Sequence, residues 1–296
     1  MFKAWDVGPA LALLDAVSDL GCTVFDTAHS YGEGSCERIL GRWVRDRGNR
    51  DGVVIISKGA HHSEGRNRVT PSDIALDLRD SLARLEVDCI DLYFLHRDDP
   101  DVPVGPIMDA LHEHVQAGRI GAIGASNWTH RRIREANDYA ASHGLTPFVA
   151  TSPHFSLAEQ VEPPWENCVS ITGPEAAEAR EWYEAQGMPV FSWASLSLGF
   201  MSGRISRRDL NDGTDVLWKR SFGTDENFQR LDRAKELGER KGLTIPQVAV
   251  AYVLNRSLEV FPIIASASRS EFEANSRALE VLLTHEETAW LNLEID

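Results

Sequence analysis

The sequence contains few cysteines, and they do not form close pairs. Cys22, Cys36, Cys89 and Cys168 are widely spaced along the 296 residues, and no C-x-x-C spacing occurs. A chain of this length can bury a sizeable apolar core, whereas small secreted domains depend on disulfide bridges. The cysteines therefore predict reduced thiols in a cytoplasmic protein.

The sequence also lacks an apolar run long enough to cross a bilayer, and it does not open with a charged and apolar leader. Basic side chains are outnumbered, with 30 Lys and Arg against 45 Asp and Glu, so the formal charge is -15. An acidic surface repels both the phosphate backbone of nucleic acids and anionic lipids. We therefore expect neither nucleic acid nor a membrane among the partners.

The glycine-rich fingerprint of Rossmann-type nucleotide-binding domains is missing as well. Gly32 and Gly34 begin a G-x-G-x-x-G pattern, but Glu37 stands where the third glycine belongs. No composition shift, repeat or Gly/Ser linker divides the chain. Residues 1–296 are therefore predicted to form one domain without a separate Rossmann unit.

Short β-branched runs alternate with longer amphipathic stretches, which is typical of parallel strands joined by helices. Thr70, Pro71 and Asp73, for example, predict a capped helix start. Two irregular stretches, 159–171 and 206–225, are the candidate flaps over an active site. Seven strands are predicted, at residues 23–26, 53–58, 90–96, 122–126, 148–152, 190–193 and 261–264.

Polar side chains end or follow three of these strands. Asp26 and Lys58 each close an apolar strand, His96 closes a third, and Tyr31 follows Asp26 by five residues. Each has an ordinary explanation taken singly: a helix cap, a solvated amine, a satisfied core imidazole and a packed ring. Because the carboxyl ends of barrel strands converge on one mouth, the four together indicate a catalytic site.

The same segments resemble the aldo-keto reductase family, from about residue 10 to about residue 278. The matching motifs are residues 21–32 with 36–41, residues 81–85 with 91–96, and Gly124-Ala125-Ser126-Asn127. The resemblance implies a (β/α)8 TIM barrel. The chain starts after the point where the family has its N-terminal hairpin and first barrel strand. Residues 1–9 are therefore expected to supply a poor substitute strand or leave a gap, with a reading frame that begins upstream.

The resemblance implies a nicotinamide-dependent oxidoreductase that reduces an aldehyde or ketone to an alcohol. Tyr31 would donate the proton to the developing oxyanion, and the Lys58 ammonium would lower the phenol pKa by stabilising the phenolate. Asp26 would hold Lys58 in its charged form. His96 would hydrogen-bond the substrate oxygen and orient the carbonyl.

The resemblance also implies a set of cofactor contacts, among them a ring against the nicotinamide and a Ser-Asn pair on its carboxamide. Ser152 replaces the usual glutamine, while Ala265 and Glu271 replace the basic pair that grips the 2′-phosphate, leaving Arg269 as the nearest cation. NADP(H) is therefore favoured and NAD(H) is possible. The expected contacts are Ser126, Asn127, Ser152, Trp193, Ala194, Leu196, Ser197, Ser266, Arg269 and Asn275.

Five side chains are expected to line the substrate pocket: His61, Trp128, His154, Phe155 and Trp165. Such an aromatic surface with polar tips suits a sugar or an aryl carbonyl equally. One alternative is a metal-dependent barrel hydrolase, but the adjacent His61 and His62 would point apart, and no metal ligands are predicted. The other alternative is a non-catalytic regulatory subunit with the same barrel. The oligomeric state is not readable from the chain.

Overall fold

The computed structural model describes residues 7–63, 65–211, 213, 214 and 216–296. Seven strands run through the described residues, at the seven predicted places and with ends that agree within two residues. Most are short segments of mainly apolar residues, as expected for strands covered by helices. The strands are β1 (Val24–Asp26), β2 (Val54–Gly59), β3 (Ile90–Leu95), β4 (Ile120–Ser126), β5 (Ala150–Ser152), β6 (Val190–Ser192) and β7 (Val260–Pro262).

The helices follow the predicted start signals. Thr70 caps the third helix by accepting a hydrogen bond from the backbone N–H of Asp73 at 3.3 Å, and Pro71 is its first residue. The α-helices in the described part are α1 (Val7–Ser18), α2 (Ser35–Arg47), α3 (Pro71–Leu85), α4 (Val104–Gln116), α5 (His130–His143), α6 (Ala177–Gln186), α7 (Leu217–Phe222), α8 (Asp225–Lys241), α9 (Ile245–Leu254), α10 (Arg269–Ser276) and α11 (His285–Leu291).

The chain divides into two compact units, which we describe one at a time. Unit 1 contains the described residues up to Thr151 together with Ala267–Arg269, and unit 2 contains Ser152–Ser266 and Ser270–Asp296. That residues 1–296 behave as one domain stays a prediction.

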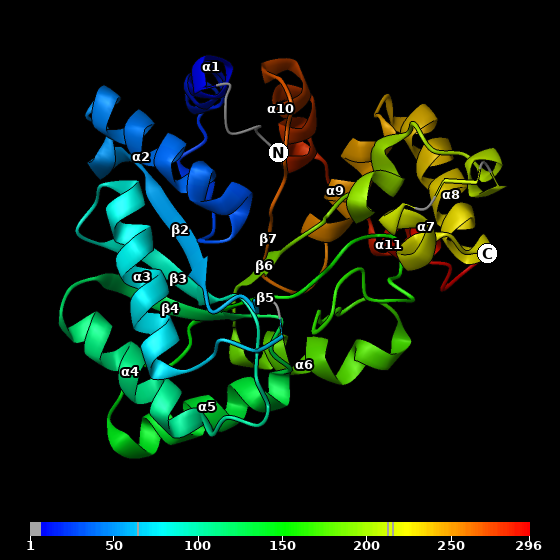
Figure 1. Ribbon diagram of the computed structural model, residues 1–296. Helices are drawn as coiled ribbons and strands as arrows, with labels where there is room; N and C mark the ends of the chain where they lie inside the picture. Colours follow the sequence, from blue (N-terminus) through cyan, green and yellow to red (C-terminus); the bar gives the residue numbers. More distant parts are fainter. Residues whose placement is uncertain (1–6, 64, 212, 215) are drawn as a thin grey trace. The chain divides into compact units, whose positions relative to one another are not determined.

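Unit 1 is a parallel sheet covered by helices. β1 pairs with β2, β2 with β3 and β3 with β4, all in parallel register. Helices α2, α3, α4 and α5 lie along these strands, each packed against the next (Figure 1). Apolar side chains on both faces of the sheet are almost completely buried, for example Ile55, Ile56, Tyr93 and Phe94. Because the strands are parallel, their carboxyl ends emerge at the same edge of the sheet.

Unit 2 repeats the pattern with fewer strands. β6 pairs in parallel with β7, and β7 packs on α9. Helix α9 also packs on α8, and α8 packs on α11. Long loops and 3-10 turns connect these elements, including η4 (Ser197–Ser202) after β6.

The start of the chain is helical where it is described. Residues 7–9, part of the stretch expected to form a poor strand or a gap, begin α1. Residues 1–6, on which the rest of that expectation falls, lie outside the described residues. Ala10 and Val17 are the buried residues of α1, and Gly21 adopts φ 91° after the helix.

The contact between α2 and α3 tolerates no side chain at Gly41. A Cβ on Gly41 would lie 2.6 Å from Leu85 Cα, at the end of α3. We expect Gly41→Ala to lower the free energy of unfolding by about 1 kcal/mol or more in urea titration, since overpacking costs more than the helix propensity of alanine returns. Gly52→Ala is the matched control, because nothing lies within 4 Å of its Cβ position. Equal midpoints for the two variants would contradict this account of the helix contact.

Candidate functional site

The segment after β1 carries Tyr31 back toward β2. Asp26 ends β1, and the backbone N–H of His29 then donates to the carbonyl oxygen of Lys58 at 2.8 Å, which extends the pairing with β2. Tyr31 begins the turn η1 (Tyr31–Gly34). This turn places the Tyr31 ring near the carboxyl end of β2.

Lys58 lies at the centre of the resulting cluster. Its ammonium donates to Asp26 Oδ1 at 2.5 Å, to the Thr27 carbonyl oxygen at 2.9 Å and to Tyr31 Oη at 3.4 Å. The Lys58 side chain is 3% exposed and that of Asp26 14%. Unit 1 therefore brings together three of the four residues that the sequence predicts to be catalytic, around one buried charge.

Burial and charge act in opposite directions on this cluster. Burial by itself lowers the pKa of Lys58, but the Asp26 carboxylate and the Tyr31 hydroxyl outweigh it, so the pKa is raised overall. Burial raises the pKa of Asp26, and Lys58 opposes that rise. The pair is therefore an ion pair that keeps Lys58 charged.

The pKa of Tyr31 is raised above 10.0, chiefly by burial. Lys58 lowers it, as the sequence suggests, but the desolvation of the phenolate is the larger effect. The expected net lowering by Lys58 is thus not what this geometry produces. At neutral pH Tyr31 is a protonated phenol beside an ammonium, which is the form that can donate a proton.

His96 follows β3 and lies against the same cluster. Its ring meets the Tyr31 ring edge-on, with centroids 5.5 Å apart, and the His61 ring edge-on at 4.8 Å. Burial lowers the pKa of His96 well below 6.5, and the nearby Lys58 and Arg97 lower it further. His96 is therefore a neutral imidazole, which can donate one hydrogen bond and accept another.

The end of β4 is tied to His96. Asn127 adopts a left-handed φ of 59°, and its Nδ2 donates to the His96 carbonyl oxygen at 3.2 Å and to Ser126 Oγ at 3.1 Å. Left-handed residues other than glycine cost energy and concentrate at functional sites. Ser126 and Asn127, both predicted cofactor contacts, are thus buried in unit 1 beside the histidine.

Arg97 is a residue that sequence reasoning missed. It is 5% exposed, and its Nη1 donates to the His96 carbonyl oxygen at 2.8 Å. Its charge contributes to lowering the pKa of both Tyr31 and His96. The available signal was its position, directly after a histidine that ends a strand.

The predicted pyrophosphate segment lies in unit 2, where the backbone is unusual. Ala194 and Ser197 have φ of 50° and 53°, and Leu198 follows at 53°. Ser197 Oγ donates to Ser156 Oγ at 2.9 Å, and Trp193 stacks obliquely on Trp165 with centroids 6.1 Å apart. The N–H groups of Ser197 and Gly199 donate to the carbonyl oxygens of Ala194 and Leu196, so this segment is a series of tight turns. Leu196 lies within the same segment.

The remaining predicted cofactor residues fall in both units. In unit 2 the Ser266 hydroxyl is buried and finds no hydrogen-bond partner among the described residues, and Asn275 on α10 is 5% exposed. Glu271 lies 3.8 Å from Arg204, a cation that sequence reasoning missed because 67 residues separate the two. In unit 1 Arg269 lies 3.7 Å from Asp19, at an exposed position. Ser152, also in unit 2, is 1% exposed.

The five predicted substrate-pocket residues differ in exposure. His61 is half-buried beside His96, and the Trp165 ring in unit 2 is 45% exposed. Trp128, His154 and Phe155 are buried inside their units. His154 is bonded through both ring nitrogens, to Ser170 and Ser156, and burial lowers its pKa to about 3. Their contact with a substrate stays a prediction.

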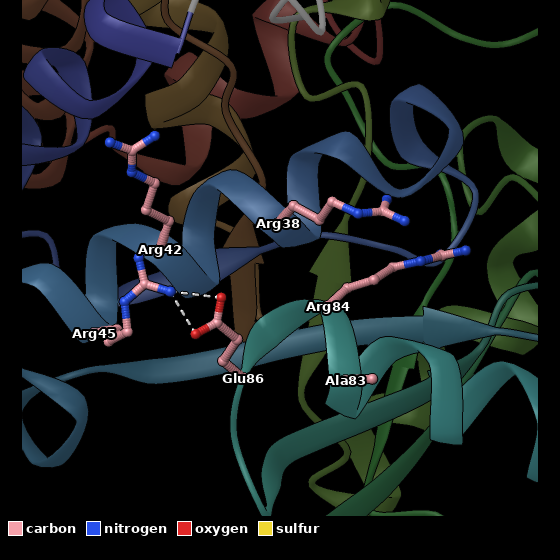
Figure 2. Close-up of a pocket in the computed structure, with 6 residues that line it drawn as sticks. All are labelled: Arg38, Arg42, Arg45, Ala83, Arg84 and Glu86. Atoms are coloured by element: carbon pink, nitrogen blue, oxygen red, sulfur yellow. Dashed lines mark hydrogen bonds and ion pairs between the residues drawn. The ribbon is translucent and has the colours of Figure 1, made fainter.

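A separate hollow between α2 and α3 lies outside this cluster. Figure 2 shows its lining, which includes four arginines, Arg38, Arg42, Arg45 and Arg84. Three of them are already paired with carboxylates, so the hollow offers little unsatisfied charge.

No group of three or more His, Cys, Asp or Glu side chains in the described residues could hold a metal ion. None of the described helices is both long and apolar enough to cross a membrane.

Known proteins resemble this chain in sequence and in fold. The Aldo/keto reductase family profile matches residues 7–292. A norsolorinic acid reductase of Emericella nidulans is 32% identical over an alignment of 290 residues, with 94% of this chain and 70% of that protein covered. An NADP(+) aldo-keto reductase of Schizosaccharomyces pombe is 29% identical, covering 92% of this chain and 78% of that one.

A solved structure of a thermostable aldo-keto reductase, in complex with the inhibitor epalrestat, has the same fold. Its TM-score is 0.75 at 22% identity, with 98% of this chain and 88% of that chain covered. The predicted fold class, the (β/α)8 barrel of the aldo-keto reductases, is thereby confirmed.

The lowered pKa of His96 gives a testable pH dependence. An unfolded histidine takes up a proton near about pH 6.5, whereas the folded His96 resists it. The stability that His96 contributes is therefore complete above about pH 6.5 and declines as the pH falls. We expect the free energy of unfolding to decline less from about pH 7 to about pH 5 in His96→Gln than in the unmodified protein. Ring NMR signals of His96 that titrate near the ordinary value would contradict the assignment.

Proposed function

Since this chain belongs to the aldo/keto reductase family and is an oxidoreductase, we propose that it reduces an aldehyde or ketone to an alcohol with a nicotinamide cofactor. The observation that supports this function is the Lys58 ammonium, bonded to Asp26 at 2.5 Å and to Tyr31 at 3.4 Å. A phenol next to a buried ammonium is suited to release its proton to an oxyanion and to remain as a stabilised phenolate.

The proposed reaction balances with these groups. A reduced nicotinamide, when bound, would supply a hydride to the carbonyl carbon, and the π electrons of the C=O bond would pass to the oxygen. Tyr31 transfers its hydroxyl proton to that oxygen, which completes the alcohol, and Lys58 stabilises the phenolate that remains. A proton from solvent then restores the phenol. In the oxidative direction Tyr31 is the base.

His96 orients the carbonyl in this proposal. Because its pKa is low, the ring stays neutral and donates a hydrogen bond without adding a second positive charge beside Lys58. Its ring lies edge-on to Tyr31, so one oxygen atom can lie within reach of both groups. His96 thereby helps to bind the oxygen that Tyr31 protonates.

The residues that would hold the cofactor have features that fit a nicotinamide dinucleotide. Ser126 and Asn127 offer buried amide and hydroxyl groups beside His96, suited to a carboxamide. Ala194 and Ser197 would lie against the pyrophosphate, and the Ser266 hydroxyl is buried without a partner among the described residues. Trp193 would stack on the nicotinamide ring, and Ser152, Leu196 and Asn275 complete the proposed set.

The substrate class stays open between a sugar and an aryl carbonyl. His61 lies beside His96 at the proposed reaction centre and would contact either. The proposal extends the pocket to Trp128, His154, Phe155 and Trp165. Turnover of a panel of aldehydes and ketones, followed by the loss of NADPH absorbance, tests the function. No turnover with any member would favour the alternative of a regulatory subunit.

Removal of the Tyr31 hydroxyl is the direct test of the acid. We expect Tyr31→Phe to bind the cofactor normally and to lose turnover by about 10²-fold or more, as is typical when a general acid is removed. Cofactor binding by fluorescence titration is the control, because the ring itself remains. Near-normal turnover in this variant would rule out Tyr31 as the proton donor.

We propose that NADP(H) is preferred over NAD(H), by about tenfold or less, or roughly 1.4 kcal/mol. Cations that bond the 2′-phosphate provide such discrimination. Arg269 is the nearest cation in sequence, but it also lies 3.7 Å from Asp19, and Glu271 would repel a phosphate unless Arg204 neutralises it.

Dissociation constants for NADPH and NADH, at low and high salt, check this preference. Arg269→Ala should reduce it, and Arg204→Ala shows whether the second cation contributes. A preference of about a thousandfold, roughly 4 kcal/mol, that survives Arg269→Ala would show that the phosphate binds elsewhere.

A further inference from the structure

The turn that carries Tyr31 has a strained backbone. Gly32, Glu33 and Gly34 have φ of 55°, 56° and 81°, so three successive residues are left-handed. Glu33 pays the steric cost of its Cβ in this region, and the two glycines lose the freedom they have in an unfolded chain. Such a turn persists only when its surroundings hold it.

Arg84, near the end of α3, contacts this turn on both sides. Its Nη1 donates to the carbonyl oxygen of His29, two residues before Tyr31, at 3.0 Å. Its guanidinium also covers Gly34, since a Cβ there would lie 2.5 Å from Cζ and 2.6 Å from Nε. One planar side chain therefore limits the movement of the turn before and after Tyr31.

Glu37 connects Arg84 to the strand that carries Lys58. Glu37 is fully buried in the first turn of α2, and its Oε2 accepts from Arg84 Nη1 at 3.2 Å. Its Oε1 accepts from the Ser57 hydroxyl at 2.7 Å. Ser57 is the residue before Lys58, so hydrogen bonds run from the Tyr31 turn through Arg84 and Glu37 to β2.

A second contact from α3 holds the end of β2. Asp77, seven residues before Arg84 on the same helix face, accepts from the backbone N–H of Ala60 at 2.9 Å. Ala60 has a left-handed φ of 59°. Helix α3 therefore bonds both the segment that carries Tyr31 and the segment that follows Lys58.

We propose that Arg84 and Glu37 form a positioning pair that sets the Tyr31 hydroxyl against the Lys58 ammonium. This inference rests on the proposed role of Tyr31 as general acid. The Lys58–Tyr31 contact of 3.4 Å is at the long end of hydrogen bonding, so a small outward movement of the turn would break it. Misplacement of a catalytic group by about 1 Å can cost about 10²-fold in rate.

The test is the double variant Glu37→Gln, Arg84→Met. It removes both charges together, since Arg84→Met alone would leave the buried Glu37 carboxylate without its cation, and the amide oxygen of glutamine can still accept from Ser57. We expect kcat to fall about tenfold or more, because the Tyr31 turn loosens. The alkaline limb of the kcat-against-pH profile should move to higher pH, because Lys58 no longer lowers the pKa of Tyr31. The Kd for NADPH should not change.

Arg42→Met is the matched control. Arg42 lines the same hollow between α2 and α3 as Arg84 (Figure 2), but its ion pair is with Asp46 on its own helix. This variant should leave kcat and the pH profile unchanged. If it lowers kcat as much as the double variant does, the effect belongs to the surface charge of the hollow and the proposal is wrong.

Thermal unfolding of the double variant shows whether a lower kcat comes from a displaced Tyr31 or from a less stable fold. A folded double variant with unchanged kcat and an unmoved alkaline limb would overturn the proposal. If the double variant does not fold, Arg84→Lys replaces it in the test, because one ammonium cannot reproduce the contacts of the guanidinium. A lower kcat with an unchanged Kd for NADPH then supports the positioning pair. An unchanged kcat overturns it. Tyr31→Phe tests the general-acid role separately from the positioning role of Arg84 and Glu37. Full turnover in that variant would show that Tyr31 is not the general acid.

Discussion

The Lys58–Asp26 ion pair is the interaction on which the candidate site depends. A buried ammonium is costly unless a carboxylate and further acceptors surround it, and here Asp26 and the Thr27 carbonyl oxygen do so. The pair joins the carboxyl ends of β1 and β2, so the charge and the strand register support each other. Removal of either partner would leave an uncompensated charge at the point where the Tyr31 turn begins.

The same burial determines the protonation of the neighbours. Tyr31 and His96 both keep their neutral forms, because charging either one in this enclosed place costs more than the surrounding charges return, and for His96 those charges are repulsive. The fixed positive charge of Lys58 is therefore flanked by two neutral groups that can donate hydrogen bonds. Such an arrangement suits a developing oxyanion and needs no change of charge before the reaction begins.

Much of this arrangement could be predicted from sequence, because strands and their ends leave periodic signals. Short β-branched runs predicted all seven strands in the described residues. The rule that parallel strands end together predicted the meeting of Asp26, Tyr31, Lys58 and His96. The supporting contacts could not be predicted in the same way. Arg84 and Glu37 are 47 residues apart, and nothing local marks them as partners. The left-handed conformation of Ala60 is likewise imposed by tertiary contacts against local preference.

Strand β2 lies between two ion pairs, Lys58–Asp26 and Arg84–Glu37, which have different roles. Ser57 and Lys58 are consecutive, so their side chains point to opposite faces of the strand. On one face Lys58 meets Asp26 and Tyr31, and on the other Ser57 meets Glu37 and, through it, Arg84. The first pair supplies charge to the candidate reaction centre, whereas the second holds the backbone that presents Tyr31. Strand β2 carries Lys58 and, through Ser57, also bonds the pair that holds the Tyr31 turn. A shift of β2 would therefore move the Lys58 ammonium and the Tyr31 turn together.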